Sequence, residues 1–446
     1  MILRPHQVRS VEACHAEYAA GARSVLLVAP TGFGKTAVAS DLISRSVSSG
    51  HRVLFLVHRI EIIRDTVRRL RALGLRVGTI VAGFDADPDA PVQVASIQTI
   101  DARGIGAFRP DFVVTDEAHH AAAATYRALY EQCAPRWHLG LTATPMRADG
   151  AGLGDAFERM VVGATVRELT DGGYLAPCDA LVAPASSREG IALDEAVAVD
   201  RYCAGRATVV FVQTVARARE VAARIPRAAA VYGDMAVDDR ARALADFELG
   251  ALDVLVTVYV LTEGWDCARA DTAVLARNFG SAGTYMQVGG RVLRADPARP
   301  NKRALIVDLA DNVYTHGALD AERAFSLGNE PIKAEDVTPR LCAACGAVRR
   351  GDEAECWRCG TTHPLPKPTI VRDEALVAFS GDTSWSATKQ DYYERLEIRR
   401  AARDYKRGWT AHRFLAKFGH WPNGYSLPRE TLELIEHAAA MREVGT

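Results

Sequence analysis

The chain has 446 residues, of which 48% are hydrophobic and 24% are charged, and its formal net charge is −1. This composition excludes a disordered chain, and the length favours about three domains. The longest apolar runs, such as Val53–Val57, have the length of a strand and are far too short to span a membrane. We therefore expect no membrane partner, no signal peptide and a cytoplasmic location. The charge excludes a protein that coats DNA by bulk electrostatics, although a binding groove needs only local positive charge.

Short β-branched runs alternate with helical patterns up to about residue 325, which predicts parallel sheets joined by crossover helices. The first five expected strands are Ser24–Ala29, Arg52–Val57, Val92–Ala95, Phe112–Thr115 and His138–Thr142. The next five are Thr208–Val212, Ala229–Tyr232, Asp253–Thr257, Thr272–Ala276 and Ala304–Val307. A glycine-containing stretch of weak periodicity separates the two sets, and we place a boundary between two lobes there, near residue 190.

The predicted fold class is α/β, with two parallel-sheet lobes that occupy residues 1–190 and 191–325. Beyond them, paired cysteines and prolines replace the alternating pattern. Residues 326–366 are predicted to form a linker and a small four-cysteine module, and residues 367–446 a basic, aromatic and helical tail.

The first strand runs directly into Ala-Pro-Thr-Gly-Phe-Gly-Lys-Thr, residues 29–36, and a helical pattern follows. Such a turn points backbone N–H groups at one place, and the helix dipole adds positive potential. Gly32 and Gly34 would let the main chain approach a phosphate closely. Lys35 would reach the β- and γ-phosphates of ATP, and the Thr36 hydroxyl would ligate Mg²⁺. The alternative is a glycine-rich turn whose Lys-Thr pair only caps the helix.

Two adjacent carboxylates, Asp116 and Glu117, follow an apolar strand that is expected to be buried. Burying unpaired carboxylates is unfavourable, and a Mg²⁺·ATP site would explain both. Asp116 would then hold the metal through its water, while Glu117 orients and deprotonates the attacking water. The alternative is a helix N-terminus, where acidic residues are favourable.

The segment Gln287-Val-Gly-Gly-Arg-Val-Leu-Arg carries Arg291 and Arg294, three residues apart. On a helix this spacing presents both guanidinium groups on one face. Arginines supplied across an interface stabilise the charge that develops during phosphoryl transfer. A solvated basic helix face is the alternative, and the preceding glutamine and glycines favour the catalytic interpretation.

Taken together, these segments resemble the ordered motifs of superfamily 2 DEAD/DEAH-box helicases. The resemblance covers about residues 2–310 and is carried by Arg4–Gln7, Ala29–Thr36 (motif I), Val57–Glu61 (motif Ia), Ser96–Thr99, Asp116–His119 (motif II), Thr142–Pro145 (motif III), Val210–Val212 (motif IV), Thr262–Asp266 (motif V) and Gln287–Arg294 (motif VI). Within the superfamily the chain is most similar to RadD-like bacterial and phage helicases with a C-terminal four-cysteine motif. It departs from the usual pattern after motif V, where Cys267-Ala268 replaces Ala-Pro.

The resemblance implies two RecA-like lobes that bind ATP between them. Gln7 would read the adenine edge, and Gly264 and Asp266 would contribute to nucleotide binding. The residues that would couple the nucleotide state to lobe closure are His119, Thr142, Thr144 and Gln287. The implied activity is that of a DNA helicase or translocase in DNA repair, recombination or phage replication, with RNA not excluded as the track. The alternatives are an ATP-switched nucleic-acid-binding adaptor and the motor subunit of a restriction or defence complex.

Cys342 and Cys345 form one pair separated by two residues, and Cys356 and Cys359 form a second. Tetrahedral Zn²⁺ needs four soft ligands, which two such turns supply together. Because four cysteines leave no open coordination position, we predict a structural zinc ion. A redox-active cysteine pair is the alternative.

The tail segment Tyr392–Trp421 interleaves eight lysines and arginines with seven aromatic residues and only three acids. Basic and aromatic side chains together contact phosphates and stack on bases, which favours a nucleic-acid-binding tail. The alternative is a small helical domain whose aromatic residues form its own core. Single-strand-binding or repair proteins are the protein partners that we expect for this tail.

Overall fold

The computed structural model divides the chain into two compact units, residues 1–366 and 367–446. The residues that it describes are 2–57, 61–81, 84, 86–121, 124–147, 150–183, 191–261, 265–330, 332, 334, 340–342, 344–345, 347–349, 355–363, 389–402, 406, 408–418, 422, 427, 429, 432 and 435.

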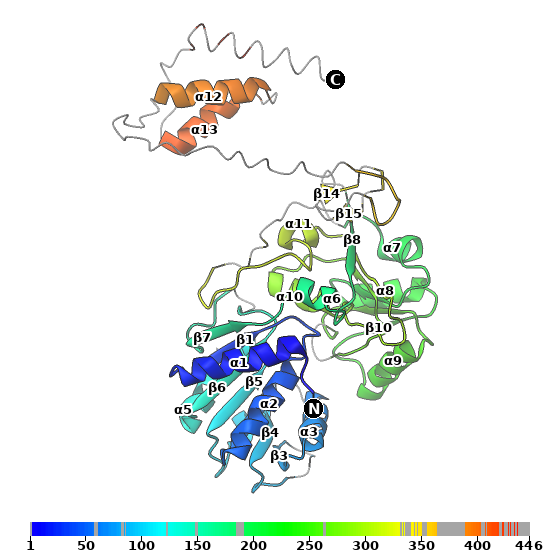
Figure 1. Ribbon diagram of the computed structural model, residues 1–446. Coiled ribbons are helices and arrows are strands. Elements are labelled where there is room, and N and C mark those ends of the chain that lie inside the picture. Colours follow the sequence, from blue (N-terminus) through cyan, green and yellow to red (C-terminus); the bar gives the residue numbers. More distant parts are fainter. Residues whose placement is uncertain are drawn as a thin grey trace, which may run out of the picture. The chain divides into compact units, whose positions relative to one another are not determined.

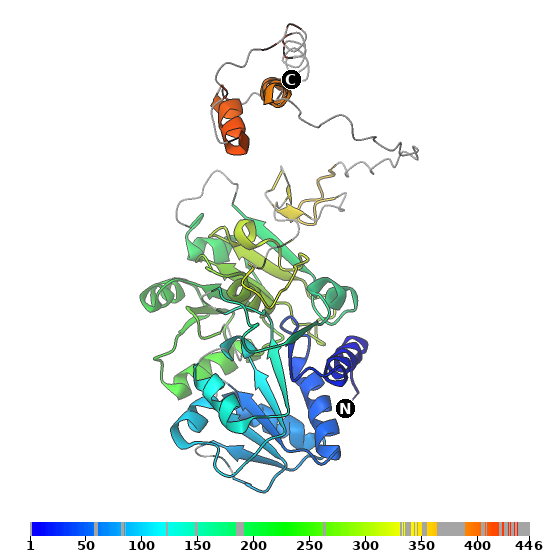
Figure 2. The ribbon, with the colours of Figure 1, turned by 90° about the vertical axis from the view of Figure 1, so that its left-hand side faces the viewer.

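The first lobe is built on a seven-stranded sheet in the order β3-β4-β2-β5-β6-β1-β7, and every strand pair in it is parallel. Its strands are β1 (Ser24–Val28), β2 (Val53–Val57), β3 (Val77–Ile80), β4 (Val92–Ser96), β5 (Phe112–Asp116), β6 (Trp137–Thr142) and β7 (Arg159–Val162). Its helices are α1 (Pro5–Ala19), α2 (Lys35–Ser48), α3 (Glu61–Ala72), α4 (Ile97–Arg103) and α5 (Ala124–Cys133), with a 3₁₀ turn at Ala118–His120. Helices cover both faces of the sheet (Figures 1 and 2).

Burial on both faces explains why a central strand such as β2 is a continuous apolar run. Along β2, Val53 and Phe55 belong to the core that contains residues of α1, α2 and α3. The intervening residues Leu54 and Leu56 point to the opposite face, into a core shared with α4 and α5. All four side chains are fully buried, so the strand is pinned in register by both layers of helices.

The second lobe has a six-stranded sheet in the order β10-β11-β9-β12-β13-β8, again entirely parallel. Its strands are β8 (Cys178–Val182), β9 (Thr208–Phe211), β10 (Ala228–Val231), β11 (Val254–Thr257), β12 (Thr272–Leu275) and β13 (Ala304–Asp308). The helices from residue 163 to 317 are α6 (Val166–Asp171), α7 (Glu195–Tyr202), α8 (Val215–Arg224), α9 (Val237–Leu249), α10 (Ala282–Gly290) and α11 (Asn312–His316).

The predicted α/β class is confirmed, and each of the ten expected strands is present with its ends within one residue of the prediction. Within the two lobes, three strands were not predicted, namely β3, β7 and β8. The last of these changes the lobe boundary: β8 pairs with β13 at the edge of the second sheet, with Leu181 opposite Val307. The second lobe therefore begins at β8, before the predicted boundary near residue 190.

The cysteine module packs on the second lobe. It contains a short antiparallel pair, β14 (Arg340–Leu341) and β15 (Val348–Arg349). Ala347 forms an antiparallel bridge with Leu181 of β8, and Cys342 and Cys356 are buried in the core that β8 shares with α7 and α8. The module thus covers the edge strand of the second sheet, which removes an exposed edge.

In the described part of residues 367–446, the helices α12 (Lys389–Ala402) and α13 (Gly408–Phe418) pack against each other. Phe414 is fully buried, and its ring lies 6.1 Å from that of Tyr393. These two aromatic residues therefore form a core of the unit, while Trp409 lies under the guanidinium of Arg413. Tyr405 and Trp421 fall outside the described residues. Among the helices that the structure describes, none is long and apolar enough to cross a membrane.

Candidate ATP site

The loop between β1 and α2 has a backbone that only glycine adopts readily. Gly32 and Gly34 have φ angles of +87° and +90°, in the left-handed region. A Cβ atom on Gly32 would lie 2.6 Å from Leu175 Cδ2, and a Cβ atom on Gly34 would overlap the side-chain nitrogen Nε2 of Gln7. Both positions thus require glycine for conformation and for packing. The loop ends at Lys35, the first residue of α2, so the helix N-terminus faces the loop.

Lys35 lies folded back across this loop, where its Nζ donates a hydrogen bond of 2.9 Å to the carbonyl oxygen of Ala29. Burial lowers the pKa of Lys35, and the nearby carboxylates of Glu117 and Asp116 oppose that effect. Thr36 follows in the first turn of α2. The lysine therefore lies next to the acidic pair in the same lobe, as a phosphate-binding lysine beside a metal site would.

Asp116 is the last residue of β5, and Glu117 directly after it has a left-handed backbone with φ 50°. Burial, and then the charge of Glu117, raises the pKa of Asp116 to about 6. Glu117 Oε2 is buried and makes no hydrogen bond to the part of the chain that the structure describes. Buried carboxylates of this kind are stabilised by a divalent cation and its water ligands. The pair fits the magnesium and water-activating roles predicted for it.

His119 connects the acidic pair to the end of β6. Its Nδ1 lies 3.5 Å from Glu117 Oε2 and 3.4 Å from Thr142 Oγ1. The Thr142 hydroxyl donates to the carbonyl oxygen of Thr144 at 2.7 Å and accepts from the Thr144 N–H at 3.2 Å. His119 and Thr142 thus form a chain of contacts from Glu117 to the loop that follows β6.

The arginines of the second lobe follow α10. This helix ends at Gly290, so Arg291 is its C-cap and Arg294 lies in an extended segment that pairs with Leu175. The prediction that both arginines occupy one helix face is therefore wrong. The chain leaves the helix because Ala176 N donates a hydrogen bond of 2.7 Å to the carbonyl oxygen of Leu293, which draws this segment onto the interlobe connection.

Both arginines nevertheless lie at the nucleotide site. Arg291 and Arg294 are close enough to lower the pKa of Lys35, and burial lowers the pKa of Arg294 itself to about 10. Arg291 Nη1 donates to the carbonyl oxygen of Trp265 at 2.5 Å, and Arg294 forms an ion pair with Asp266.

Glycines of α10 bring the two lobes into contact beside this site. A Cβ on Gly290 would lie 2.8 Å from Thr31 Cβ of the phosphate loop, and one on Gly283 would lie 2.8 Å from Thr144 Oγ1. Gln287, on the same helix, is buried. The helix thus touches the loop after β1 and the loop after β6 at once.

Gln7 packs against the phosphate loop. Its Nε2 donates to the carbonyl oxygen of Phe33 at 3.0 Å, and its Oε1 accepts from Arg4 N at 2.9 Å. Arg4 also lies over the ring of Tyr174, at 4.9 Å from its centroid. The adenine-reading role of Gln7 stays a prediction, and Gly264 lies outside the described residues.

Lys302 is a buried residue near the site that the sequence did not indicate. Its Nζ donates to the carbonyl oxygens of Ala268 and Ala270, at 2.8 and 2.6 Å, and to that of Arg294 at 2.7 Å. It therefore fixes the backbone that carries Arg294. A lone lysine in a loop has no pattern around it, so no sequence signal could have identified this role.

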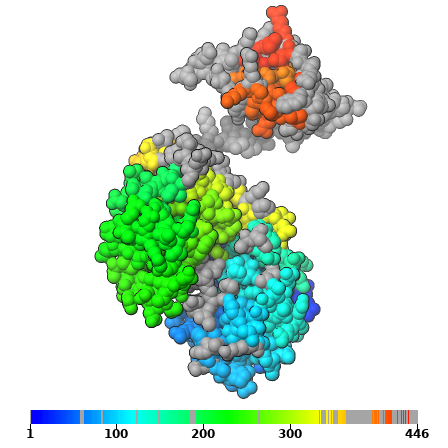
Figure 3. Space-filling model, turned by 180° about the vertical axis from the view of Figure 1, so that it is seen from behind, coloured from blue at the N-terminus to red at the C-terminus, as the bar shows by residue number. Residues whose placement is uncertain are grey.

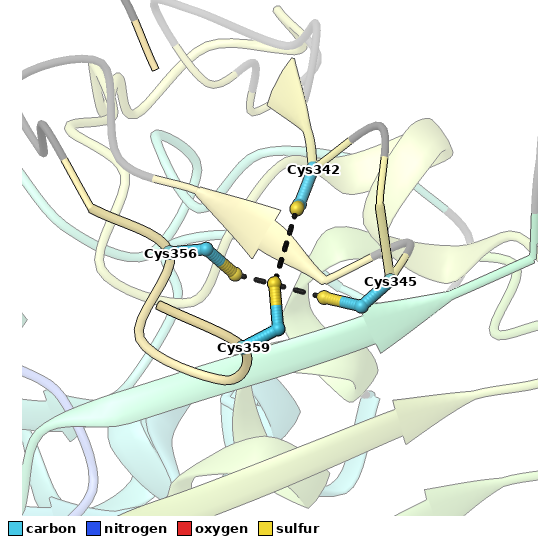
Figure 4. Close-up of side chains that lie close together, drawn as sticks. All are labelled: Cys342, Cys345, Cys356 and Cys359. Carbon is cyan, nitrogen blue, oxygen red and sulfur yellow. Dashed lines mark hydrogen bonds between the residues drawn. The ribbon is translucent and has the colours of Figure 1, made fainter. Parts of the chain in front are cut away.

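The four cysteines form a second site, in which their sulfur atoms point toward one another (Figure 4). All four sulfur atoms lie within 4.8 Å of one another, and the Cys342–Cys359 and Cys345–Cys356 sulfur distances are both 3.6 Å. Tetrahedral zinc with Zn–S bonds of about 2.3 Å requires sulfur separations of about 3.8 Å. The cluster therefore fits a small zinc module. His363 Nε2 lies 3.3 Å from Cys342 Sγ, beside the cluster.

The fold and the ATP site define a nucleotide hydrolase with two parallel-sheet lobes around one cleft. Residues 1–147 match the family model of the type III restriction enzyme res subunit, and residues 192–296 match that of the helicase conserved C-terminal domain. The chain belongs to the superfamily 2 helicases, and its two lobes are RecA-like.

The chain is also similar to individual proteins and to a solved structure. The chain is 27% identical to a 51.5 kDa protein of Lactococcus phage (isolate 7-9), with 75% of this chain and 77% of that protein covered. It is 23% identical to the candidate ATP-dependent helicase IRC3 of Saccharomyces cerevisiae, over 76% of this chain and 55% of that protein. The DNA-bound Type ISP restriction-modification enzyme LlaBIII has a similar fold, with a TM-score of 0.55, 16% identity, and 69% of this chain but 28% of that chain covered.

We expect Glu117→Gln to lower kcat for ATP hydrolysis by about 10²–10⁴-fold, because glutamine cannot accept the proton of the attacking water. ATP should still bind, since Lys35 and the loop are intact. Phosphate release measures kcat, and a fluorescent ATP analogue measures binding. Glu131→Gln, an exposed residue of α5, is the matched control. Equal hydrolysis by the two variants would show that Glu117 is not the base.

Proposed function

We propose that this chain is an ATP-driven DNA translocase, whose lobes close on ATP and reopen after its hydrolysis. The convergence of Lys35 and Glu117 from the first lobe with Arg291 from the second carries the proposal. Neither lobe holds a complete catalytic set, so hydrolysis requires closure. A cycle of closure and release between two lobes that each grip a strand produces stepwise movement.

The residues have separate tasks in this cycle. The loop and Lys35 bind the phosphates, Glu117 takes a proton from water, and Arg291 and Arg294 stabilise the charge that develops on the transferred phosphoryl group. Thr36 and Asp116 would hold Mg²⁺, which neutralises charge on the phosphate oxygens. His119 passes the state of Glu117 to the loop containing Thr144, which contacts the second lobe.

A surface for nucleic acid lies at the carboxyl edge of the second sheet, where α/β sheets bind ligands. Tyr259 follows β11 and Arg277 follows β12. The Arg277 guanidinium lies 4.1 Å from the centroid of the Tyr259 ring and donates to its hydroxyl. The ring is half exposed. A pocket of about 560 Å³ at the same edge is lined in part by Thr214 and Asn278. An exposed ring beside a cation suits base stacking and phosphate attraction.

Tyr259→Ala is expected to weaken binding of single-stranded DNA by about 1–3 kcal/mol, the contribution of one stacked base. Tyr259→Phe keeps the ring and should bind nearly as well as the wild type. Fluorescence anisotropy at a fixed salt concentration measures both affinities. Equal weakening by alanine and phenylalanine would assign the effect to the hydroxyl and remove stacking from the proposal.

We also propose that the four-cysteine cluster binds one structural Zn²⁺. Each cysteine pair forms a tight turn: Cys342 N donates to Ala347 O and Cys356 N to Thr361 O, both at 2.9 Å. Trp357 Nε1 donates to Val348 O at 2.8 Å and ties the two turns together.

The double substitution Cys342→Ser with Cys356→Ser should reduce the zinc content from about one ion per chain to about none. The melting temperature should fall as well, because both side chains lie in the core of the second lobe. Mass spectrometry of the metal and differential scanning calorimetry give the two readouts. Cys178→Ser, outside the cluster, is the control, and a full zinc equivalent in the double variant would disprove the zinc site.

The restriction-enzyme match of the first lobe favours a second candidate, a motor subunit that moves on duplex DNA for a separate nuclease. Displacement of a triplex-forming strand detects movement on a duplex, and unwinding of a fork detects strand separation. We expect ATP hydrolysis to be stimulated by DNA and the triplex to be displaced. The Glu117→Gln variant should show neither DNA-stimulated ATP hydrolysis nor triplex displacement. ATP hydrolysis without triplex displacement or unwinding would instead support the adaptor alternative.

A further inference from the structure

Residues 317–330, here called the return segment, cross from the second lobe back to the first. They follow α11 and lie against the first lobe (Figures 1 and 3). The lobes are also joined by residues 163–177, so at least two of the described segments run between the lobes. The return segment contains none of the helicase motifs.

At the second lobe, Leu319 of the return segment packs on the helix that precedes the arginines. It is buried, and a Cβ atom on Gly289 of α10 would overlap its side chain. Leu319 also lines a gap of only about 10 Å³ together with Thr31 and Gly290, where α10 meets the phosphate loop. Arg291 is the next residue after Gly290. Leu319 therefore packs beside the contact between α10 and the phosphate loop.

The middle of the return segment is held as a fixed turn by Arg323. Its Nη1 donates to the carbonyl oxygens of Leu319 and Ala321, at 3.3 and 2.8 Å. Its Nη2 donates to those of His316 and Ala318, at 2.9 and 2.8 Å. The Arg323 side chain thus satisfies four backbone acceptors. Because one of them belongs to His316, the last residue of α11, the turn is tied to that helix.

At the first lobe, the segment packs under the acidic pair. Phe325 and Leu327 contact an apolar cluster that includes Leu153 and Ala118, the residue after Glu117. Two backbone amides complete the contact. Gly154 N donates to Leu327 O at 2.8 Å, and Gly152 N donates to Asn329 Oδ1 at 2.9 Å.

We propose that the return segment aligns Arg291 with the phosphate loop and Glu117 when the lobes close. Leu319, Arg323 and Leu327 are positioning residues, because they act through α10 and the cluster beneath Glu117 and touch none of the reacting atoms. The inference rests on the proposed hydrolysis of ATP at the cleft.

Gly152→Ala tests the contact with the first lobe. The backbone of Gly152 is not left-handed, so its conformation suits alanine as well as glycine. The added methyl group, however, would overlap the carbonyl oxygens of Leu327 and Gly328. We expect kcat for DNA-stimulated ATP hydrolysis to fall about 10-fold, since small displacements of catalytic groups lower rates strongly. The KM for ATP should change less than about 2-fold, because the phosphate loop is untouched. Gly233→Ala, with open space around its Cβ position, is the matched control.

A double-mutant cycle separates positioning from simple destabilisation. In an Arg291→Ala background, Gly152→Ala should lower kcat less than about 3-fold, because the aligned group is already absent. Asn329→Ala, an exposed and milder change, should show the same pattern to a smaller extent. An equal loss in both backgrounds, or an unchanged kcat, overturns the proposal. Lys35→Ala measured in parallel tests the premise separately: if this variant retains hydrolysis, the ATP site is misassigned, and the proposed function and the role of the return segment are both overturned.

Discussion

The concentration of like charges in one cleft is the constraint on which the rest of the molecule depends. Lys35 comes from one lobe and Arg291 and Arg294 from the other. Burial lowers the pKa of the lysine, and the charges of the two arginines act in the same direction. In the first lobe, burial and then the charge of Glu117 raise the pKa of Asp116 to about 6. A polyanion neutralises the cations, and a divalent cation neutralises the carboxylates. Mg²⁺·ATP supplies both, so its binding favours the closed arrangement over any separation of the lobes.

Close approach of the two backbones is the second requirement, and glycine meets it at each interlobe contact. Gly290 and Gly283 admit Thr31 and Thr144 on the catalytic side. On the other side Gly152 and Gly154 admit the return segment, where any side chain would push carbonyl oxygens away. Because glycine has no side chain at these points, the backbone of one lobe lies directly against the other lobe. A small rotation of one lobe would therefore change these contacts directly.

Sequence reasoning succeeded where one element carries its own signal. Strands such as β2 are fully buried on both faces and therefore read as unbroken apolar runs. It failed at edges: β7 is half exposed, and β8 begins with Cys178 and Asp179, so neither shows a continuous apolar run. The order of the motifs located the site. The end of α10 before Arg291, however, depends on the hydrogen bond between Leu293 and Ala176, which is distant in the sequence. Lys302 and the return segment depend wholly on such long-range contacts, which leave no local pattern.

The link between ATP and nucleic acid follows from one stretch of chain in the second lobe. Arg291 is hydrogen-bonded to the backbone of Trp265, and Arg294 is paired with Asp266. Tyr259, on the proposed nucleic-acid surface, lies only six residues before Trp265 in the sequence. In the proposed cycle, movement of the arginines on hydrolysis would therefore reach Trp265 and Asp266, which follow Tyr259 closely in the sequence. Because the first lobe would hold the phosphates meanwhile, release of phosphate would change the grip of one lobe relative to the other, which is the asymmetry that the proposed directional movement requires.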